Sequence, residues 1–256
     1  MSGVRPSVGW GVVHLMLRAI PGEAGAVEAI EAIDEFTAVD PQQVIAFSVL
    51  GGGADVGLMA LGPDLDALDV LTKKVLSGPF DVAYSFFSLT EGSEYTTGED
   101  EERARLEAAG EADVEGALAT WRERMEKYMD ARLHPRMPPK DVIAFYPMSK
   151  RRAEGANWYS LPFEDRKRLM QGHATVGRRY AGRVVQLITG ATGLDDWEWG
   201  VTLVADDPVT IKDIVYEMRF DEVTARYGEF GPFFVGLVMD PAEAFARAGL
   251  VREAAG

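Results

Sequence analysis

Residues 57–76 have the sequence GLMALGPDLDALDVLTKKVL, and residues 200–219 have the sequence GVTLVADDPVTIKDIVYEMR. The two stretches align without a gap at an offset of 143 residues, so that Leu68, for example, matches Ile211. Each stretch begins with a short apolar run typical of a buried strand and continues with apolar residues at the three- and four-residue spacing of a helix. The alignment therefore predicts an internal duplication.

Working outward from these stretches, we expect the same order of elements in both halves of the chain. In the first half, strands are expected at 8–20, 44–50, 57–62 and 82–89, and helices at 23–38 and 64–77. In the second half, strands are expected at 142–148, 183–190, 198–205 and 231–238, and helices at 162–180 and 208–218. Both orders are β-α-β-β-α-β, which is typical of ferredoxin-like units.

Such a unit has an antiparallel sheet with its helices on one face, so the other face is free to pack against a second sheet. The sequence predicts an α+β fold in which two ferredoxin-like halves form a dimeric α+β-barrel-like subunit. We expect a structural N-terminal half at 1–92 and a ligand-binding C-terminal half at 140–256. Between them, residues 93–139 combine an acidic linker with a helical connector that ends at prolines.

The composition excludes several kinds of site. The 256 residues include no cysteine, which rules out disulfides, thiolate ligands for haem or zinc, and cysteine nucleophiles. A net charge of −15 disfavours nucleic acid and anionic membranes as partners, because both attract clusters of Lys and Arg. The sequence has neither an apolar run of about 18 residues nor a signal-peptide pattern, so we expect a cytoplasmic protein.

The basic residues are concentrated in the C-terminal half. One run occupies residues 150–152 and a second 166–168, and Arg178, Arg179 and Arg183 follow. In an acidic protein this concentration is typical either of a site for an anionic small molecule or of a solvated helix face with ion pairs. The runs alone do not decide between these interpretations.

His173 is the first candidate for a metal ligand. It lies in the helix expected at 162–180, where Leu169, Val176 and Tyr180 share its stripe, so it is expected to face the sheet. The alternative interpretation is a core histidine that is bonded to a neighbouring group.

Two glycines flank His173, and glycine within a helix costs about 1 kcal/mol relative to alanine. Gly172 and Gly177 are explained if a bulky flat ligand approaches the backbone of this helix. A second histidine, His14, lies in an apolar strand, where a core role is expected.

Tyr146 is a candidate reactive residue. It lies near the end of the strand expected at 142–148, and Lys150 follows four residues later. A phenol beside cations is able to donate a hydrogen bond to a carboxylate or to be oxidised to a radical. The alternative interpretation is a strand-end tyrosine that has neither role. The C-terminal half is also rich in aromatic residues, among them Trp158, which suits a flat apolar ligand or a barrel core.

Five segments of the C-terminal half together resemble the coproheme decarboxylases, a family within the chlorite dismutase-like superfamily. They are YPMSKRR (146–152), NWYSLP (157–162), MQGHATVGRRY (170–180), VVQLITGATGLDDWEWGVTL (184–203) and MRFDEVTARYGEFGPFFVG (218–236). The match is dense across residues 140–238, and its pattern is most similar to the actinobacterial branch. The first half resembles the family in its order of elements rather than in its motifs.

The resemblance implies a role for each matching residue. His173 occupies the position of the proximal iron ligand, Tyr146 that of the catalytic tyrosine, and Lys150 a position beside a reacting propionate. His134 resembles the distal histidine that accepts a proton from peroxide in the actinobacterial members. The other matching positions contact the macrocycle or hold its propionates, and they are Arg132, Met148, Trp158, Gln186, Arg219 and Thr224.

The reaction that the resemblance implies converts iron coproporphyrin III (coproheme) into haem b. Hydrogen peroxide oxidises two propionates to vinyl groups, through a three-propionate intermediate. The substrate brings its own iron, so no other cofactor is implied. The family also implies a homo-oligomer, typically a homopentamer.

Gln186 separates two chemistries within the superfamily. True chlorite dismutases carry an arginine at this distal position, and a neutral glutamine is a poorer clamp for an oxychlorine anion. Other interpretations remain open from the sequence. They are a chlorite dismutase or haem peroxidase on the same fold, a haem-binding carrier without turnover, and an interaction protein without a ligand.

Overall fold

The computed structural model describes residues 3–21 and 25–250. Its first half contains β1 (Gly11–Ala19), α1 (Val27–Thr37), β2 (Gln43–Val49), β3 (Val56–Gly62), α2 (Leu65–Leu76) and β4 (Phe80–Thr90). These elements lie close to their predicted positions. Residues 23 and 24 of the predicted first helix lie outside the described residues.

The connector contains α3 (Glu99–Ala108) and α4 (Val114–Leu133). The second half contains β5 (Val142–Lys150), β6 (Arg152–Ala153), β7 (Ala156–Asn157), the 3-10 helix η1 (Trp158–Ser160), α5 (Phe163–Arg178), β8 (Val184–Gly190), β9 (Trp199–Ala205), α6 (Pro208–Met218), α7 (Glu222–Tyr227), β10 (Gly228–Phe230), β11 (Phe234–Met239) and α8 (Pro241–Arg247).

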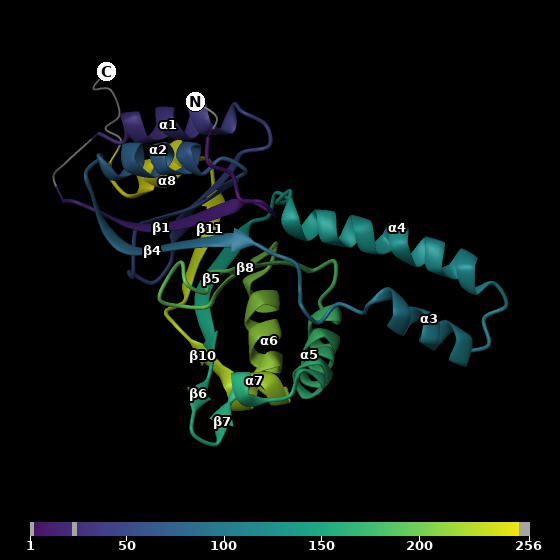
Figure 1. The fold of residues 1–256 in the computed structure, drawn as a ribbon. Helices are drawn as coiled ribbons and strands as arrows, with labels where there is room; N and C mark the ends of the chain where they lie inside the picture. Colours follow the sequence, from purple (N-terminus) through teal and green to yellow (C-terminus); the bar gives the residue numbers. More distant parts are fainter. Residues whose placement is uncertain (1–2, 22–24, 251–256) are drawn as a thin grey trace.

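The strands of the two halves close into one antiparallel barrel (Figure 1). The order around it is β5-β11-β2-β3-β1-β4-β8-β9, and β9 pairs back onto β5. Within each half this is the ferredoxin-like strand order, β2-β3-β1-β4 and β8-β9-β5-β11. The predicted α+β fold with two such halves is therefore confirmed. The halves join where β11 pairs with β2 and where β4 pairs with β8.

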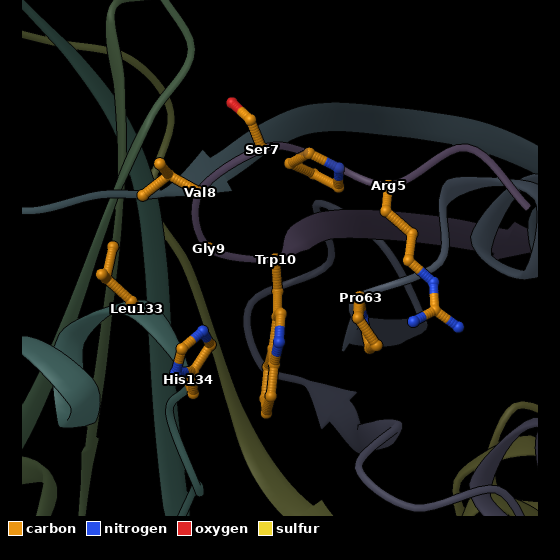
Figure 2. Close-up of a pocket in the computed structure, with 9 residues that line it drawn as sticks. Arg5, Ser7, Val8, Gly9, Trp10, Pro63, Leu133 and His134 are labelled. Carbon is orange, nitrogen blue, oxygen red and sulfur yellow. The ribbon is translucent and has the colours of Figure 1, made fainter.

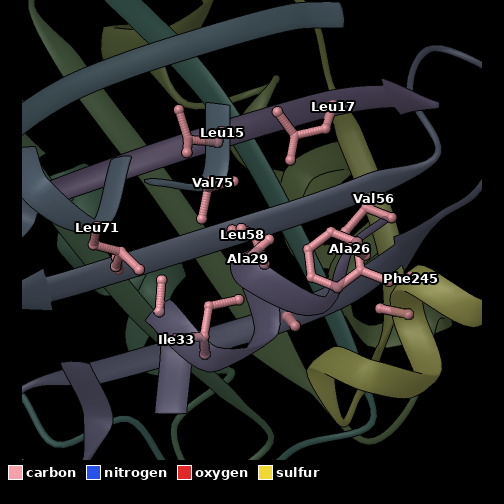
Figure 3. Packing of buried hydrophobic residues seen from close by; sticks show 14 of the residues in the cluster. Leu15, Leu17, Ala26, Ala29, Ile33, Val56, Leu58, Leu71, Val75 and Phe245 are labelled. Carbon is pink, nitrogen blue, oxygen red and sulfur yellow. The ribbon is translucent and has the colours of Figure 1, made fainter. Parts of the chain in front are cut away.

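An apolar core fills the outer face of the N-terminal half (Figure 3). Leu15 and Leu17 of β1 meet Ile33 of α1 and Phe245 of α8 in one buried cluster. Although α8 follows β11 in the sequence, it packs on the N-terminal half beside α1 and β2 (Figure 1). Helix α8, the last helix of the described residues, therefore completes the core of the first half.

The barrel interior is a second apolar core, and it contains one histidine. His14 is fully buried, its Nε2 lies 2.9 Å from the hydroxyl of Thr202, and its ring stacks on Phe145 with centroids 3.9 Å apart. Burial lowers the pKa of His14 to about 3, so the imidazole is neutral. The expectation of a core histidine is confirmed, and the Thr202 contact links the two halves.

The pairing registers show which residues are equivalent in the two halves. Leu15 pairs with Leu58 in the N-terminal half, and Tyr146 pairs with Val201 in the C-terminal half. Leu58 and Val201 are related by the offset of 143 residues found in the sequence. Tyr146 is therefore the structural equivalent of Leu15.

The first helices of the two halves pack differently. Helix α1 buries Ala29, Ala32, Ile33 and Phe36, whereas α5, all of which the structure describes, buries Leu169 alone. Helix α5 lies against α6 and α7 rather than flat on the strands. The C-terminal half therefore does not repeat the filled outer face of the N-terminal half.

The acidic part of the connector, predicted as a linker, forms α3. Residues 99–102 are all acidic and occupy the first turn, where negative charge interacts favourably with the helix dipole. The Arg122 guanidinium of α4 pairs with Glu99, and the two helices extend together away from the barrel (Figure 1). In the described part of the chain, no helix is long and apolar enough to cross a membrane.

Candidate functional site

Three predicted site residues lie on one face of β5. Tyr146, Met148 and Lys150 alternate along the strand, so their side chains point the same way. Tyr146 is buried, and its ring stacks on Phe233 with centroids 4.3 Å apart and planes 22° apart. Burial raises the pKa of Tyr146 to about 12, against a smaller opposing effect of the Arg219 charge, so its phenol keeps its proton at neutral pH.

Lys150 is a buried cation at the end of β5. Its Nζ lies 5.0 Å from the centroid of the Trp158 ring, which is a cation–π contact. Burial lowers the pKa of Lys150 to about 8, although the charges of Asp221 and Glu198 act in the opposite direction. Its backbone N–H donates to Glu198 across 2.7 Å, which fixes the strand end. The structure thus brings together Lys150 and Trp158, two residues that the sequence analysis named separately.

His173 is held by a carboxylate from a neighbouring helix. Its Nδ1 lies 3.0 Å from Oδ2 of Asp221, the residue that caps the N-terminus of α7. Burial raises the pKa of Asp221, but the hydrogen bonds from His173 and Thr224 outweigh it and leave the pKa below its usual value. A neutral imidazole that donates from Nδ1 presents an unprotonated Nε2. This is the form that binds iron.

Thr224 is hydrogen-bonded to the carboxylate that holds His173. Its backbone N–H donates to Oδ1 of Asp221 across 3.0 Å, and its hydroxyl donates to Oδ2 across 2.8 Å. The resemblance implied that this hydroxyl holds a propionate. In the structure it bonds to the carboxylate that orients His173.

Arg219 and Gln186 are the two remaining predicted contacts of the C-terminal half. The Arg219 guanidinium lies 4.1 Å from the centroid of the Phe230 ring, and Phe230 in turn packs 5.9 Å from Tyr146. Gln186 lies on β8 and is exposed, although its side chain faces α5. An exposed strand residue beneath a helix shows that the outer face is open there.

The two glycines of α5 have different surroundings. A Cβ at Gly177 would lie 3.7 Å from Nε2 of Gln186 and 3.3 Å from Met218, so this glycine faces the sheet. A Cβ at Gly172 would meet no described atom within 4 Å. The expectation that both glycines admit a ligand therefore stays a prediction, and only Gly177 has protein atoms of the sheet side within reach.

Arg132 lies at the rim of the region. Its Nε donates to the Glu91 carbonyl across 3.2 Å, and the Glu91 carboxylate accepts the Trp199 indole N–H across 3.0 Å. Trp199 pairs with Met148 in the β5–β9 register. A chain of contacts therefore joins Arg132 to the face that carries Tyr146.

His134 is not brought to this group. Its ring packs on Trp10 with centroids 5.4 Å apart, and Trp10 shares a buried cluster with Leu187. Leu187 follows Gln186 in β8, and successive strand residues point to opposite faces. His134 therefore lies on the other side of the sheet from Gln186 and Tyr146. It directly follows Leu133, the last residue of α4.

The basic runs separate into two kinds. Lys150 is buried at the site, whereas Arg166, Lys167 and Arg168 pair with acidic side chains of the connector and of α5 itself. Arg178 donates to Thr175, Arg179 pairs with Glu217, and both arginines are exposed. The interpretation as a solvated helix face therefore holds for the basic residues of α5 and its C-terminal end.

The sequence did not single out Asp221 or Phe233. Asp221 carries a weak local signal, because Asp is a preferred helix N-cap residue whose carboxylate accepts backbone N–H groups. Phe233 carries no such signal, since its stacking on Tyr146 depends on the pairing of β10 and β11 with β5.

Comparison with known proteins gives a consistent result. A family model described as chlorite dismutase matches residues 23–239. A coproheme decarboxylase of Staphylococcus carnosus is 43% identical over 197 residues, which are 75% of this chain and 72% of that protein. A putative heme-binding protein of Haloquadratum walsbyi is 45% identical over 201 residues, which are 77% of this chain and 35% of the relative. This chain thus spans about a third of that longer relative.

Solved structures share the fold. A heme-binding protein from Thermus thermophilus has a TM-score of 0.75 and 35% identity, with 97% of this chain and 100% of that chain covered. A mutant chlorite dismutase from Candidatus Nitrospira defluvii has a TM-score of 0.69 and 15% identity, with coverage of 95% and 97%. At 15% identity the second likeness concerns the fold alone.

Proposed function

Because the chain belongs to the chlorite dismutase family, we propose that it is a coproheme decarboxylase that binds iron coproporphyrin III through His173 and makes haem b. The observation that carries the proposal is the placement of Tyr146 and Lys150, buried on one face of β5. The negative charge of Asp221 raises the pKa of Lys150, and its carboxylate is hydrogen-bonded to His173. Asp221, Lys150 and His173 therefore belong to one region. The likeness to the Staphylococcus enzyme supports the same assignment.

The residues present fit an iron porphyrin. His173 offers an imidazole oriented by Asp221, and such outer carboxylates strengthen a histidine as a metal ligand. The outer face near Gln186 is open, and Phe230, Phe233 and Trp158 supply apolar walls. Residues 140–256 therefore form the half that we assign to the ligand. Met148 belongs to the same apolar wall.

Four carboxylates on coproheme need cationic partners. The Arg219 charge acts on Tyr146, Lys150 lies farther along the same face of β5, and Arg132 lies at the rim, so we assign the three cations to propionates. Lys150 keeps the reacting propionate against the phenol. Thr224 acts through Asp221, as its hydrogen bonds indicate.

Tyr146 is the group that takes a hydrogen atom from the propionate. Bound coproheme supplies the iron at which hydrogen peroxide is reduced. Tyr146 gives up an electron and a proton to the oxidised site, and its phenoxyl radical then removes hydrogen from the propionate β-carbon. Loss of a second electron and of CO2 leaves the vinyl group. For each propionate, R–CH2CH2COO⁻ + H2O2 + H⁺ gives R–CH=CH2 + CO2 + 2 H2O.

The raised pKa of Tyr146 suits this role. With a pKa of about 12 the phenol is protonated at neutral pH, so it is able to give an electron and a proton together. His134 has no part in this assignment, because it lies across the sheet. Pentameric assembly and a cytoplasmic location stay predictions.

The experiment is peroxide treatment of the ferric coproheme complex, followed by mass measurement of the porphyrin. We expect the loss of two CO2 and four hydrogens in total from the wild-type complex. Tyr146→Phe should bind coproheme with unchanged affinity and yield no vinyl product. Full turnover by Tyr146→Phe would contradict the role of the phenol.

A second candidate function is haem binding without turnover, which the names of the longer relatives favour. In that case the porphyrin mass is unchanged after peroxide. Decomposition of chlorite is the other alternative on this fold. Gln186 disfavours it, because a neutral amide does not hold an oxychlorine anion as a guanidinium does.

A further inference from the structure

A buried carboxylate, Glu198, lies where the end of β5 meets the start of β9. It directly precedes β9, and only 7% of its side chain is exposed. A carboxylate is seldom buried unless hydrogen bonds and opposite charges offset its loss of water. The contacts of Glu198 therefore indicate its role.

Glu198 is bonded to the end of β5 through its side chain and its backbone. Its carboxylate accepts the backbone N–H of Lys150 across 2.7 Å. Its own backbone N–H donates to the Met148 carbonyl and to the Ser149 hydroxyl, both across 3.2 Å. One residue thus holds the last three residues of β5.

The same carboxylate also borders the segment that runs from β5 to η1. The guanidinium of Arg152 in β6 lies 4.0 Å from its second oxygen. Burial raises the pKa of the Tyr159 phenol in η1, and the Glu198 carboxylate raises it further. Trp158 precedes Tyr159 in η1, and its ring centroid lies 5.0 Å from the Lys150 Nζ. Glu198 is therefore next to the Lys150 backbone and to the turn that carries the aromatic partner of Lys150.

The ammonium of Lys150 depends on these neighbours. Within residues 3–21 and 25–250, no carboxylate oxygen lies within 4.0 Å of its Nζ. A lysine side chain is a flexible four-carbon stem. Without an ion pair, its ammonium keeps one position only where the strand end and the aromatic partner are themselves fixed.

The charged groups around Lys150 come from the elements that pack against the end of β5. Burial lowers the pKa of Lys150 to about 8, while the charges of Asp221 and Glu198 act in the opposite direction. Asp221 is shared with His173, so Glu198 is the carboxylate that is bonded to the Lys150 backbone. The other charged side chains of these elements are exposed or pair with other side chains, and they are Arg151, Arg152, Arg226 and Glu229.

The hollow on the other side of the sheet provides a contrast. There the Trp10 indole stands between His134 and Arg5 (Figure 2), and Asp130, the partner of His134, has 71% of its side chain exposed. Exposed ion pairs contribute little, because water and salt screen them. The buried Glu198 instead acts on its neighbours at short range and with little screening.

We propose that Glu198 is the positioning residue for Lys150. Its buried carboxylate fixes the strand end and the Trp158 turn, and so holds the Lys150 ammonium for the propionate that reacts at Tyr146. The last part rests on the proposed function, since only coproheme gives the ammonium a propionate to hold. The action of Glu198 on Lys150 concerns the protein alone.

The first experiment measures the reactivity of Lys150 towards acetic anhydride in the full chain between pH 6 and 10, by mass measurement of its peptides. The acetylation midpoint of the wild type should lie near pH 8. Glu198→Gln keeps an oxygen for the Lys150 N–H but removes the charge, so its midpoint should move to lower pH. Glu229→Gln is the control, because it removes an exposed charge of β10 that pairs with Arg151, and its midpoint should equal that of the wild type. An unmoved midpoint in Glu198→Gln, or equal shifts in both variants, would overturn the proposal.

The second experiment separates a positioning role from a merely structural one. Glu198→Ala lacks the acceptor, so at pH 6 it should lower kcat for coproheme about 10- to 100-fold through a misplaced ammonium. The Kd for coproheme should change by less than about threefold, because His173 and the other cations remain. Glu198→Gln restores the acceptor and should recover most of the lost kcat. Equal losses of kcat and affinity in Glu198→Ala would indicate a structural role and contradict the proposal.

Circular dichroism checks that each variant is folded. If Glu198→Ala does not fold, the pH dependence of Glu198→Gln decides. Its ratio of kcat at pH 8 to kcat at pH 6 should lie about twofold below that of the wild type, because less of its Lys150 is charged at pH 8. An unchanged ratio would overturn the proposal.

These outcomes are separate from those of the proposed function. If the wild type yields no vinyl product while the acetylation midpoint moves only in Glu198→Gln, the decarboxylase is contradicted and the action of Glu198 on Lys150 is supported. If the wild type makes haem b and the midpoint does not move, the decarboxylase stands and the role of Glu198 is overturned.

Discussion

The two halves of the barrel share one strand order but fill its outer face differently. In the N-terminal half, Leu15 lies under α1, α2 and α8 in a closed apolar core. In the C-terminal half, the equivalent residue is Tyr146, and the strand beside α5 exposes Gln186. The comparison shows that a duplicated scaffold gains a site where one copy leaves its outer face incompletely covered.

Helix α8 accounts for much of the difference. It follows the last strand of the C-terminal half and adds Phe245 to the core of the N-terminal half (Figure 3). After β4, the chain instead runs into α3 and α4, which extend away from the barrel (Figure 1). The N-terminal half is thus closed by a helix from the other half, and within residues 3–21 and 25–250 no helix of the N-terminal half covers the C-terminal half in this way.

The largest expected effect is on the free energy of unfolding, when the closed core of the N-terminal half is disrupted. Phe245 is fully buried and packs 5.3 Å from Phe80, so Phe245→Ala should lower the free energy of unfolding by about 3–5 kcal/mol. Phe233→Ala is the matched change in the other half, and it should cost clearly less because 41% of Phe233 is exposed. Urea unfolding measures both. Equal costs would contradict the contrast between a closed core and an open face.

The next effect concerns the carboxylate that orients His173. Asp221→Asn should weaken ferric coproheme binding about 10- to 100-fold, because the amide is a poorer acceptor for Nδ1 and leaves a weaker iron ligand. Asp207 also caps a helix of this half, accepting from Val209 across 2.9 Å, but it touches no histidine. Asp207→Asn is therefore the control, and equal losses for the two variants would show a capping effect only.

The sequence predicted the two equivalent halves and the half that carries the site. It did not predict why the outer faces of the two halves differ. The offset between 57–76 and 200–219 predicts two equivalent halves, since strand and helix periods are local properties. The motifs place Tyr146, Lys150 and His173 in one half by resemblance. Neither predicts that α8 crosses to the other half, because that contact depends on barrel closure.

His134 shows the same limit at the level of one residue. The family resemblance implied a distal position for it, but His134 follows the last residue of α4 and its ring packs on Trp10. Asp221 was missed because its N-cap pattern predicts a helix start and says nothing about His173. Side chains that meet across helices are set by tertiary packing, which a single sequence does not display.

A smaller effect is expected where the two halves meet. The pKa of His14 is about 3 in the folded chain, below the usual 6.5, so protonation favours the unfolded chain as pH falls below 6.5. Stability from this residue is fully present above pH 6.5 and should be about 2 kcal/mol lower at pH 5. His14→Gln keeps a polar partner for Thr202 and should flatten that part of the stability–pH curve. An unchanged slope would contradict a neutral buried His14.

The smallest effect concerns Lys150, whose folded pKa of about 8 lies below its ordinary 10.5 because of burial. Its ammonium form is present below pH 8 and is lost as pH rises through 8, so coproheme turnover should fall about twofold by pH 8 and about tenfold by pH 9, both relative to its value at pH 6. Lys150→Arg keeps the charge throughout this range and should remove the inflection while changing KM. Initial rates between pH 6 and 9 measure both variants. If the arginine variant retained the inflection, the titrating group would be a residue other than Lys150. The titration of Lys150 would then not be a functional difference between the two halves.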